Sequence, residues 1–201
     1  TEFGRVKYYN LYTTFLNPNQ ADYGRKKHAT IHYLDFAITD KINFGVFESI
    51  LWQSKTEDVN KGYEFAYLNP IIFYRPVEFS KYSSKGNALM GANANATFST
   101  VTFYGQAMLD DLNISRQKER DEENYEDGFF QNKFAFQFGA KTKFKGIKLL
   151  TEYNQVQPYT YGHRTILQNY SHMNQALAHP LGANFKELVF LSSYKNNKWL
   201  Y

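Results

Sequence analysis

The stretch that decides the fold is NALMGANANATFSTVTFYGQAMLDDL, residues 87–112. Over 88–98, every second residue is Ala, Met or Phe, and the residues between them are mostly Asn, Gly or Thr. The alternation resumes over 101–109, after Ser99 and Thr100. A period of two places neighbouring side chains on opposite faces of a strand. The stretch therefore predicts a β-hairpin with one apolar and one largely polar face.

The same period recurs at residues 130–140 and 147–154. In the first of these, phenylalanines alternate with polar residues: Phe134, Phe136 and Phe138 against Lys133, Gln137 and Lys141. In the second, Lys148 and Glu152 share one face. We predict that the phenylalanines face lipid and that the polar set faces the lumen of a barrel.

Four further segments are strands by composition, namely 6–15, 29–39, 42–52 and 185–194. They are rich in β-branched and aromatic residues, which favours strands. Charged and apolar residues share a face in these segments, however. Their faces are therefore not assigned.

Short and long connections alternate along the chain. The short links are Asp40–Lys41, Ser99–Thr100, Lys145–Gly146 and Lys195–Asn197, and the long ones are 16–27, 53–86, 113–128 and 158–184. This alternation is typical of membrane barrels, which have short turns on one side and long loops on the other. The alternative is a soluble antiparallel β-sandwich or β-barrel.

The sequence therefore predicts an all-β fold, an antiparallel transmembrane β-barrel, with residues 1–201 as part of a single outer-membrane domain. About nine strands are expected, the last cut off at WLY, Trp199–Tyr201. An odd count does not close the even-stranded barrel usual in bacteria, and an open edge leaves backbone groups unpaired in lipid. We therefore expect a fragment of a larger barrel that does not form a stable barrel alone.

Composition excludes several function classes. No run approaches the roughly 18 apolar residues of a membrane helix, and the absence of cysteine excludes thiolate sites and disulfides. A net charge of +4 is too small to indicate nucleic acid. The motifs G-x-S-x-G, P-loop and H-E-x-x-H are missing. We predict no catalytic residues, no cofactor, no metal and no nucleic-acid partner.

Three of the five histidines lie in PYTYGHRTILQNYSHMNQALAHPLGANFKE, residues 158–187, namely His163, His172 and His179. Their spacings of nine and seven match no zinc pattern. We expect hydrogen-bonding members of an ordered loop, and glycan, partner or metal contact remains the alternative. The segment 113–128 is charged and has no aliphatic residue after Ile114, so it is predicted to be a solvated loop. Calcium binding is the alternative, but the D-x-[DN]-x-[DN]-G series of a calcium loop is missing.

The segment YEFAYLNPIIFYRPVEF, residues 63–79, is too aromatic for a free loop. We predict that it packs on or inside the barrel, as a structural plug or as a ligand platform. Together with the histidine-rich stretch it supplies the candidate glycan or partner contacts, which are Tyr67, Asn69, Tyr74, Arg75, Tyr159, Tyr161, His163, Arg164, His172 and Asn174.

Four blocks resemble one protein family: YLNPIIFYRPVEFS (67–80), YGQAMLDDL (104–112), YNQVQPYTYGH (153–163) and NYSHMNQALAHPLGANFKE (169–187). They are similar to the Wzi-like capsule-assembly family of outer-membrane barrels, in the Bacteroidota branch that includes RemB-type gliding-motility proteins. Within the last block, HPLGANF resembles the branch most specifically.

The resemblance implies an outer-membrane location in a Gram-negative bacterium and a non-enzymatic role at the cell surface. Its expected partners are outer-membrane lipid, capsular polysaccharide or lipopolysaccharide, and other outer-membrane proteins. The role is capsule or exopolysaccharide attachment, or gliding motility. The alternative is an accessory or scaffold subunit of a motility or secretion assembly that binds no glycan. No ligand residue is carried over from the family.

Overall fold

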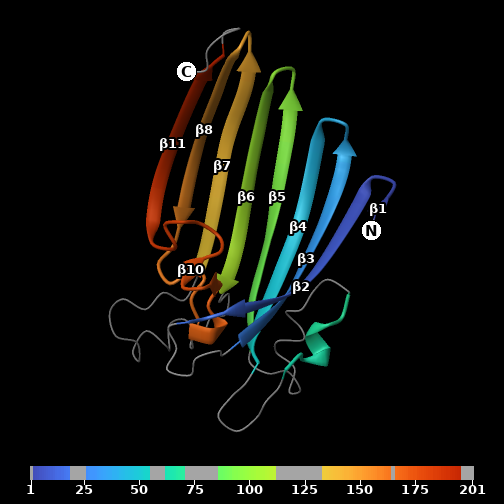
Figure 1. The fold of residues 1–201 in the computed structure, drawn as a ribbon. Helices are drawn as coiled ribbons and strands as arrows, with labels where there is room; N and C mark the ends of the chain where they lie inside the picture. The colour runs from blue at the N-terminus through green and yellow to red at the C-terminus, as the bar shows by residue number, and fades with distance from the viewer. Residues whose placement is uncertain are drawn as a thin grey trace, which may run out of the picture.

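A computed structural model describes residues 2–18, 26–54, 62–70, 86–111, 133–163 and 166–195. Over these residues the protein is antiparallel and all-β, with two single-turn 3-10 helices (Figure 1). The elements are β1 (Glu2–Phe3), β2 (Val6–Leu16), β3 (Lys26–Thr39), β4 (Ile42–Gln53), η1 (Phe65–Tyr67), β5 (Asn87–Phe98), β6 (Val101–Asp111), β7 (Lys133–Phe144), β8 (Ile147–Val156), η2 (Ile166–Gln168), β9 (Ser171–His172), β10 (Gln175–Ala176) and β11 (Phe185–Tyr194).

Nine strands form one sheet in the order β1-β2-β3-β4-β5-β6-β7-β8-β11. The remaining two, β9 and β10, pair with each other between β8 and β11. Short turns join β3 to β4, β5 to β6 and β7 to β8 at one end of the sheet, and the described segments 62–70 and 166–184 lie at the other end (Figure 1). The predicted short links at 40–41, 99–100 and 145–146 are therefore confirmed, and the link Lys195–Asn197 lies partly outside the described residues. We call the two ends the turn end and the loop end.

The β7–β8 turn shows how sequence sets the turn end. Lys145 and Gly146 both have positive φ, 44° and 84°. Two positive φ values are the signature of the type I′ turn, whose twist matches that of the flanking strands. Glycine suits the second position because it adopts positive φ without steric cost.

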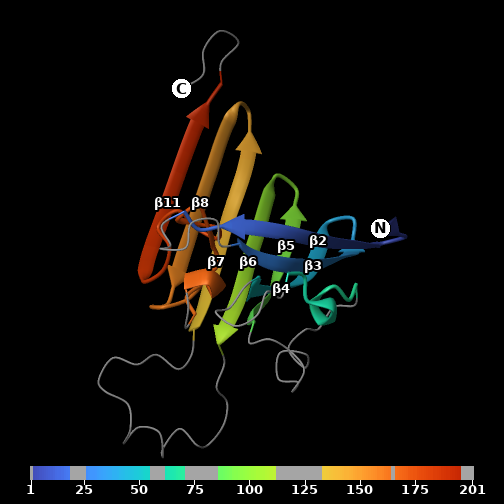
Figure 2. The same ribbon diagram turned by 60° about the horizontal axis from the view of Figure 1, so that its bottom comes forward.

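The sheet curls around the connection between β8 and β11 (Figure 2). Phe15 on β2 and Val156 on β8 pack into the same apolar cluster as Tyr170 of that connection, although five strands separate β2 from β8 in the sheet. We call this face concave and the opposite face convex. The sheet is not closed, because β1 and β11 lie at its two edges.

Strand register assigns every side chain of the sheet to a face. Ala135 pairs with Met108 on one side and Val156 on the other, so all three lie on the concave face. Phe138 pairs with Gly105 and Tyr153 on the convex face. From β5 to β11 the described convex side chains are uncharged except Lys186, whereas the concave face carries most of the charges: Asp110, Lys133, Lys141, Lys143, Lys148, Glu152 and Glu187.

The predicted separation of residues 133–141 into two faces is therefore confirmed, and the contact of one face with lipid and of the other with a lumen stays a prediction. Phe134, Phe136 and Phe138 lie on the convex face, opposite the concave set Lys133, Gln137 and Lys141. Phe136 and Phe138 stack on each other with their ring planes 5° apart. Phe138 remains 57% exposed, so the convex face presents aromatic rings outward.

Aromatic rings lie over glycines on the concave face. A Cβ added to Gly139 would lie 2.6 Å from the ring of Tyr104, its partner across the β6–β7 ladder. Tyr33 covers Gly45 in the same way. An aromatic ring that covers a strand glycine compensates for its missing side chain and helps fix the register.

Two strand predictions need comment. The short strand β1 was not predicted, because two residues carry no periodicity. The ninth predicted strand at 199–201 lies outside the described residues, as does the predicted solvated loop 113–128.

Candidate functional site on the concave face

The connection between β8 and β11, residues 157–184, lies on the concave face. It contains η2 and the β9–β10 hairpin, so its described part is ordered, as predicted. Its hairpin turn uses Met173 and Asn174, with φ of 50° and 61°. We call the described part, 157–163 with 166–184, the roof.

Side chains from several strands hold the roof. Lys27 on β3 donates to the carbonyl oxygen of Asn169 and to Ser171 Oγ. Asn87 on β5 donates to the carbonyl oxygen of Gln168 at 3.0 Å. Buried polar groups are stable only when they are hydrogen-bonded, so these buried donors make the roof's position specific.

The roof also contacts β6 and β7. Lys133 Nζ donates to the carbonyl oxygen of Gly162 at 3.2 Å, and Asp110 Oδ2 accepts from the backbone N–H of Tyr161 at 2.7 Å. Burial, with Asp110 and Tyr170 nearby, raises the pKa of the Tyr161 phenol to about 12. Tyr161 is therefore a protonated hydroxyl at physiological pH.

Beneath the roof lies an apolar cluster of the sheet, formed by Ala29, Leu51, Leu89, Met108, Ala135 and Val156. Between this cluster and the roof is a cavity of about 210 Å³. Phe47, Leu89 and Met108 are among its sheet residues, and Tyr161 and Tyr170 line it from the roof. We call it the concave cavity.

A chain of polar side chains runs along one side of the concave cavity. Tyr104 OH donates to Glu152 Oε2 at 2.6 Å. Asn154 Nδ2 donates to Glu152 Oε1 at 2.9 Å and to Glu187 Oε2 at 3.0 Å. His179 Nε2 lies 3.3 Å from Glu187 Oε2. Asn154 and His179 line the cavity, so two carboxylates lie next to it, held in place by an amide.

The predicted site residues of the roof occupy different positions. Tyr161 lines the concave cavity. The Nδ1 atom of His172 accepts from the backbone N–H of Leu16 at 3.1 Å. Tyr159 and Asn174 are exposed, and the backbone N–H of His163 donates to Asn169 Oδ1 at 2.7 Å. Arg164 lies outside the described residues.

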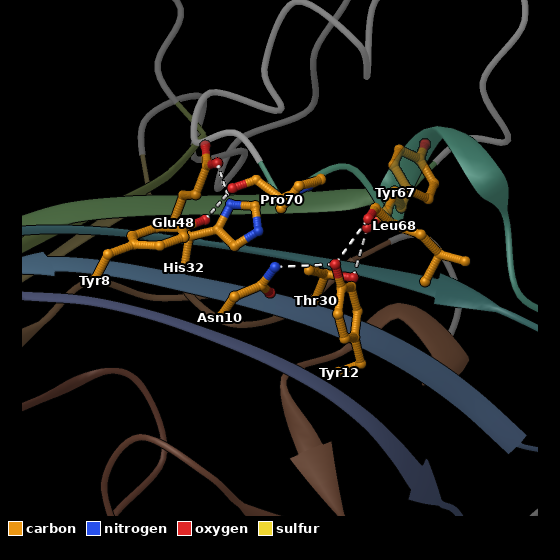
Figure 3. A network of polar contacts seen from close by, with 9 residues as sticks. All are labelled: Tyr8, Asn10, Tyr12, Thr30, His32, Glu48, Tyr67, Leu68 and Pro70. Atoms are coloured by element: carbon orange, nitrogen blue, oxygen red, sulfur yellow. Dashed lines mark hydrogen bonds and ion pairs between the residues drawn. The ribbon is translucent and has the colours of Figure 1, made fainter. Parts of the chain in front are cut away.

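The segment 62–70, which contains η1, lies on the convex face and so does not join this site. Figure 3 shows Thr30 Oγ1 and Tyr12 OH donating to the carbonyl oxygens of Tyr67 and Leu68, both at 2.7 Å. Tyr8 OH donates to the carbonyl oxygen of Pro70. Segment 62–70 is thus fastened to β2 and β3, with the roof on the other side of the sheet.

The predicted contact residues in segment 53–86 also occupy different positions. Tyr67 is fully buried and its ring packs on Trp52, so it is part of a second apolar cluster with Ile50 and Ala88. Asn69 is exposed. Tyr74 and Arg75 lie outside the described residues. The two groups of predicted contacts therefore do not form one site.

Sequence reasoning missed the cavity residues contributed by the sheet, among them Ser49, Gln106, Gln137 and Asn154. A signal for three of them was present. Gln106, Gln137 and Asn154 occupy the polar positions of strands whose alternation was recognised. Ser49 had no such signal, because the faces of its strand were not assigned.

His172 and His179 make the kind of contacts expected of histidines in an ordered loop. His179 Nδ1 accepts from the backbone N–H of Leu181 at 3.2 Å. Over the part of the chain that the structure describes, no three His, Asp or Glu side chains gather as metal ligands.

Comparisons with models of protein families, with curated proteins and with solved structures found no match for this chain. Within the described ranges, no helix is long and apolar enough to cross a membrane.

Proposed function

We propose that the described sheet is part of the wall of an outer-membrane β-barrel in a Gram-negative bacterium. Its role is non-enzymatic attachment of capsular polysaccharide or exopolysaccharide at the cell surface, or gliding motility. The single observation that supports this most is the division of charge between the two faces. Over β5–β11 the described convex side chains are mostly apolar and carry no charge except Lys186, while the other charges are on the concave face.

This division matches the two solvents of a barrel wall. Lipid contacts the outside of a transmembrane barrel, and water or a polar plug contacts the inside. Convex side chains such as Phe138 and Leu188 are 57% and 75% exposed, and such exposure is favourable in lipid. Strands of 10–12 residues are also long enough to cross the apolar band of a membrane when tilted.

Polysaccharide binding is supported by the concave cavity at the loop end. Aromatic rings of the sheet and the roof surround it, and amide side chains line its wall. Sugar rings have apolar C–H faces that stack on aromatic side chains and hydroxyl groups that bind amides. The resemblance of 153–163 and 169–187 to the Wzi-like family agrees with this role.

Cysteine labelling tests the membrane topology, because the chain has no cysteine of its own. Tyr159→Cys introduces a thiol at the exposed surface of the loop end, and Lys145→Cys introduces one in a turn. A membrane-impermeant maleimide is expected to label Tyr159→Cys on intact cells, but Lys145→Cys only after the outer membrane is opened. Equal labelling of both in intact cells would contradict the proposal.

Deletion of the encoding gene tests the role. The deletion strain is expected to release polysaccharide into the medium that the parent strain retains on the cell, and the restored gene should reverse the loss. Unchanged retention in the deletion strain would exclude polysaccharide attachment.

Exposed apolar side chains at the loop end favour a second candidate function, that of a scaffold subunit in a motility or secretion assembly. Phe65 is 90% exposed, and Tyr159 and Leu181 are also exposed. Phe65 lies on the segment that covers the convex face and the other two residues lie on the roof, so both faces present apolar groups at the loop end that partner proteins would cover. Stoichiometric co-purification of partner proteins, with no glycan binding, would favour this alternative.

A further inference from the structure

The wall of the concave cavity contains a hydroxyl group with an unused hydrogen-bonding capacity. Ser49 on β4 lines the cavity and is 5% exposed. Its Oγ has no hydrogen-bond partner among the described residues. Buried hydroxyls are nearly always hydrogen-bonded, since burial removes their water. Ser49 therefore offers a donor and an acceptor to a molecule in the cavity.

The remaining wall combines flat apolar surfaces with amides. Phe47, Tyr161 and Tyr170 contribute rings, and Gln106 and Gln137 contribute amides from neighbouring strands. This lining suits a molecule whose faces are apolar and whose edge carries hydroxyl groups. An alkyl chain would leave the amides and Ser49 unsatisfied.

The charged groups around the cavity determine which of these molecules it can bind. None of the described lining residues is a lysine or arginine. The nearest polar chain instead contains Glu152 and Glu187, joined through Asn154. His179, the lining residue that can carry a positive charge, is already paired with Glu187 at 3.3 Å, so an anionic ligand would meet two carboxylates and no lysine or arginine to offset them.

Size narrows the class further. A volume of about 210 Å³ is below the roughly 300–1,000 Å³ typical of small-molecule sites. This is room for one six-membered ring, not for an oligosaccharide.

We propose that the concave cavity binds a single uncharged sugar ring and discriminates against uronic acids. The proposal rests on the proposed polysaccharide function and adds to it the site and the sugar class. Only one ring of a polysaccharide chain is then held beneath the roof.

Binding of monosaccharides to the complete barrel protein that contains this chain, purified in detergent, tests the class. Saturation-transfer NMR titrations would compare glucose, galactose and mannose with glucuronic and galacturonic acid. At least one neutral sugar is expected to bind ten-fold or more tightly than its uronic acid. Equal or tighter binding of the acids would overturn the proposal.

Two variants on one strand test the site. Ala135 lies on the concave floor, and Ala140 lies on the convex face of the same strand β7. Ala135→Leu fills the cavity and is expected to abolish binding of the neutral sugar, whereas Ala140→Leu should leave it unchanged. Equal effects of the two variants would overturn the proposed site.

Ser49→Ala tests the hydroxyl contact without filling the cavity. Sugar binding is expected to weaken at least five-fold while thermal stability stays unchanged or rises, because an unsatisfied hydroxyl is removed. Unchanged sugar binding in this variant would overturn the role of Ser49.

The same experiments separate the inference from the proposed function. Cells that retain polysaccharide while the purified protein binds no monosaccharide would overturn the inference and support the function. Monosaccharide binding that Ala135→Leu abolishes, in a protein whose loss releases no polysaccharide, would support the site and overturn the function.

Discussion

Two long connections at the same end of the sheet cover opposite faces. Segment 62–70 lies on the convex face against β2–β5, and the roof lies on the concave face against β2–β8. Figure 3 shows both, with segment 62–70 above the strands and the roof below. Both are held by strand side chains that donate to loop carbonyl oxygens, as Thr30 does for segment 62–70 and Asn87 for the roof.

The two covers differ in what lies beneath them. Segment 62–70 covers the buried pair His32–Glu48, whose Nδ1 and Oε1 atoms are 3.1 Å apart, together with the apolar side chains of Ile50, Trp52 and Ala88. The roof covers the apolar part of the concave face, including Leu89 and Met108. Segment 62–70 therefore covers polar and apolar side chains alike, whereas the apolar cluster beneath the roof lies on the face that carries most of the charges.

This difference explains why the covers are needed. In a barrel wall, His32 and Glu48 would otherwise face lipid, where unpaired polar groups are costly. Leu89 and Met108 would otherwise face a water-filled lumen. The strands therefore need not follow the apolar-out and polar-in pattern near the loop end, because the two connections cover their side chains there.

Separating the His32–Glu48 pair should have the largest effect. Glu48→Leu leaves His32 buried beside an apolar group, and we expect it to destabilise the protein by about 3–5 kcal/mol. Chemical denaturation in detergent, followed by the fluorescence of nearby Trp52, measures the loss. The double variant His32→Leu with Glu48→Leu should recover the part of the loss that comes from leaving one partner of the pair alone. A double variant as unstable as Glu48→Leu would contradict this.

The next largest loss of stability is expected from a substitution on the part of the sheet that neither connection covers. Phe136→Lys places a charge on the convex face and should cost about 2–4 kcal/mol if that position is near the middle of the bilayer. Gln137→Lys, one residue along on the concave face, should change stability little. Folding titrations in lipid vesicles compare the two. Similar costs for both would exclude lipid contact on the convex face.

Much of the strand pattern could be predicted from the sequence. β5, β6 and β7 alternate cleanly because their convex and concave positions are not covered by other segments along most of their length. β3 and β4 could not be assigned faces for a physical reason. His32 and Glu48 lie on the same face as Ile50 and Trp52, and segment 62–70 covers them all. A long-range cover of this kind leaves no trace in the period of a strand.

The candidate site was less predictable than the sheet. The histidine-rich stretch was recognised as an ordered loop, but its position on the concave face depends on contacts such as Lys27 with Asn169, which are 142 residues apart. The aromatic segment 63–79 was expected on or inside the barrel. Its described part lies on the convex face. Thr30, which holds it there, is two residues from His32 on β3, so both side chains point to that face.

Replacing one buried hydrogen-bond donor on either face of the sheet should loosen only the connection that covers that face. Thr30→Val and Asn87→Leu each leave a buried carbonyl oxygen without its donor, so each should cost about 1–3 kcal/mol. Limited proteolysis with mapping of the cleavage sites measures the local effect. Thr30→Val should speed cleavage within 62–70 and Asn87→Leu within 166–184. If either variant exposed both segments equally, the two covers would not be independent.

The smallest effect concerns the β9–β10 hairpin, which belongs to the roof alone. Its turn residues Met173 and Asn174 both have positive φ, the geometry for which Asn-Gly is the preferred pair. The double change Met173→Asn with Asn174→Gly should therefore stabilise the roof by about 0.5–1 kcal/mol, because residues with a side chain are strained at positive φ. Slower proteolysis within 166–184 measures the gain. Lys145→Asn is the matched control, since it improves a similar turn at the other end of the sheet and should leave roof cleavage unchanged. Equal protection of segment 62–70 by the hairpin variant would mean that the two covers are coupled through the sheet.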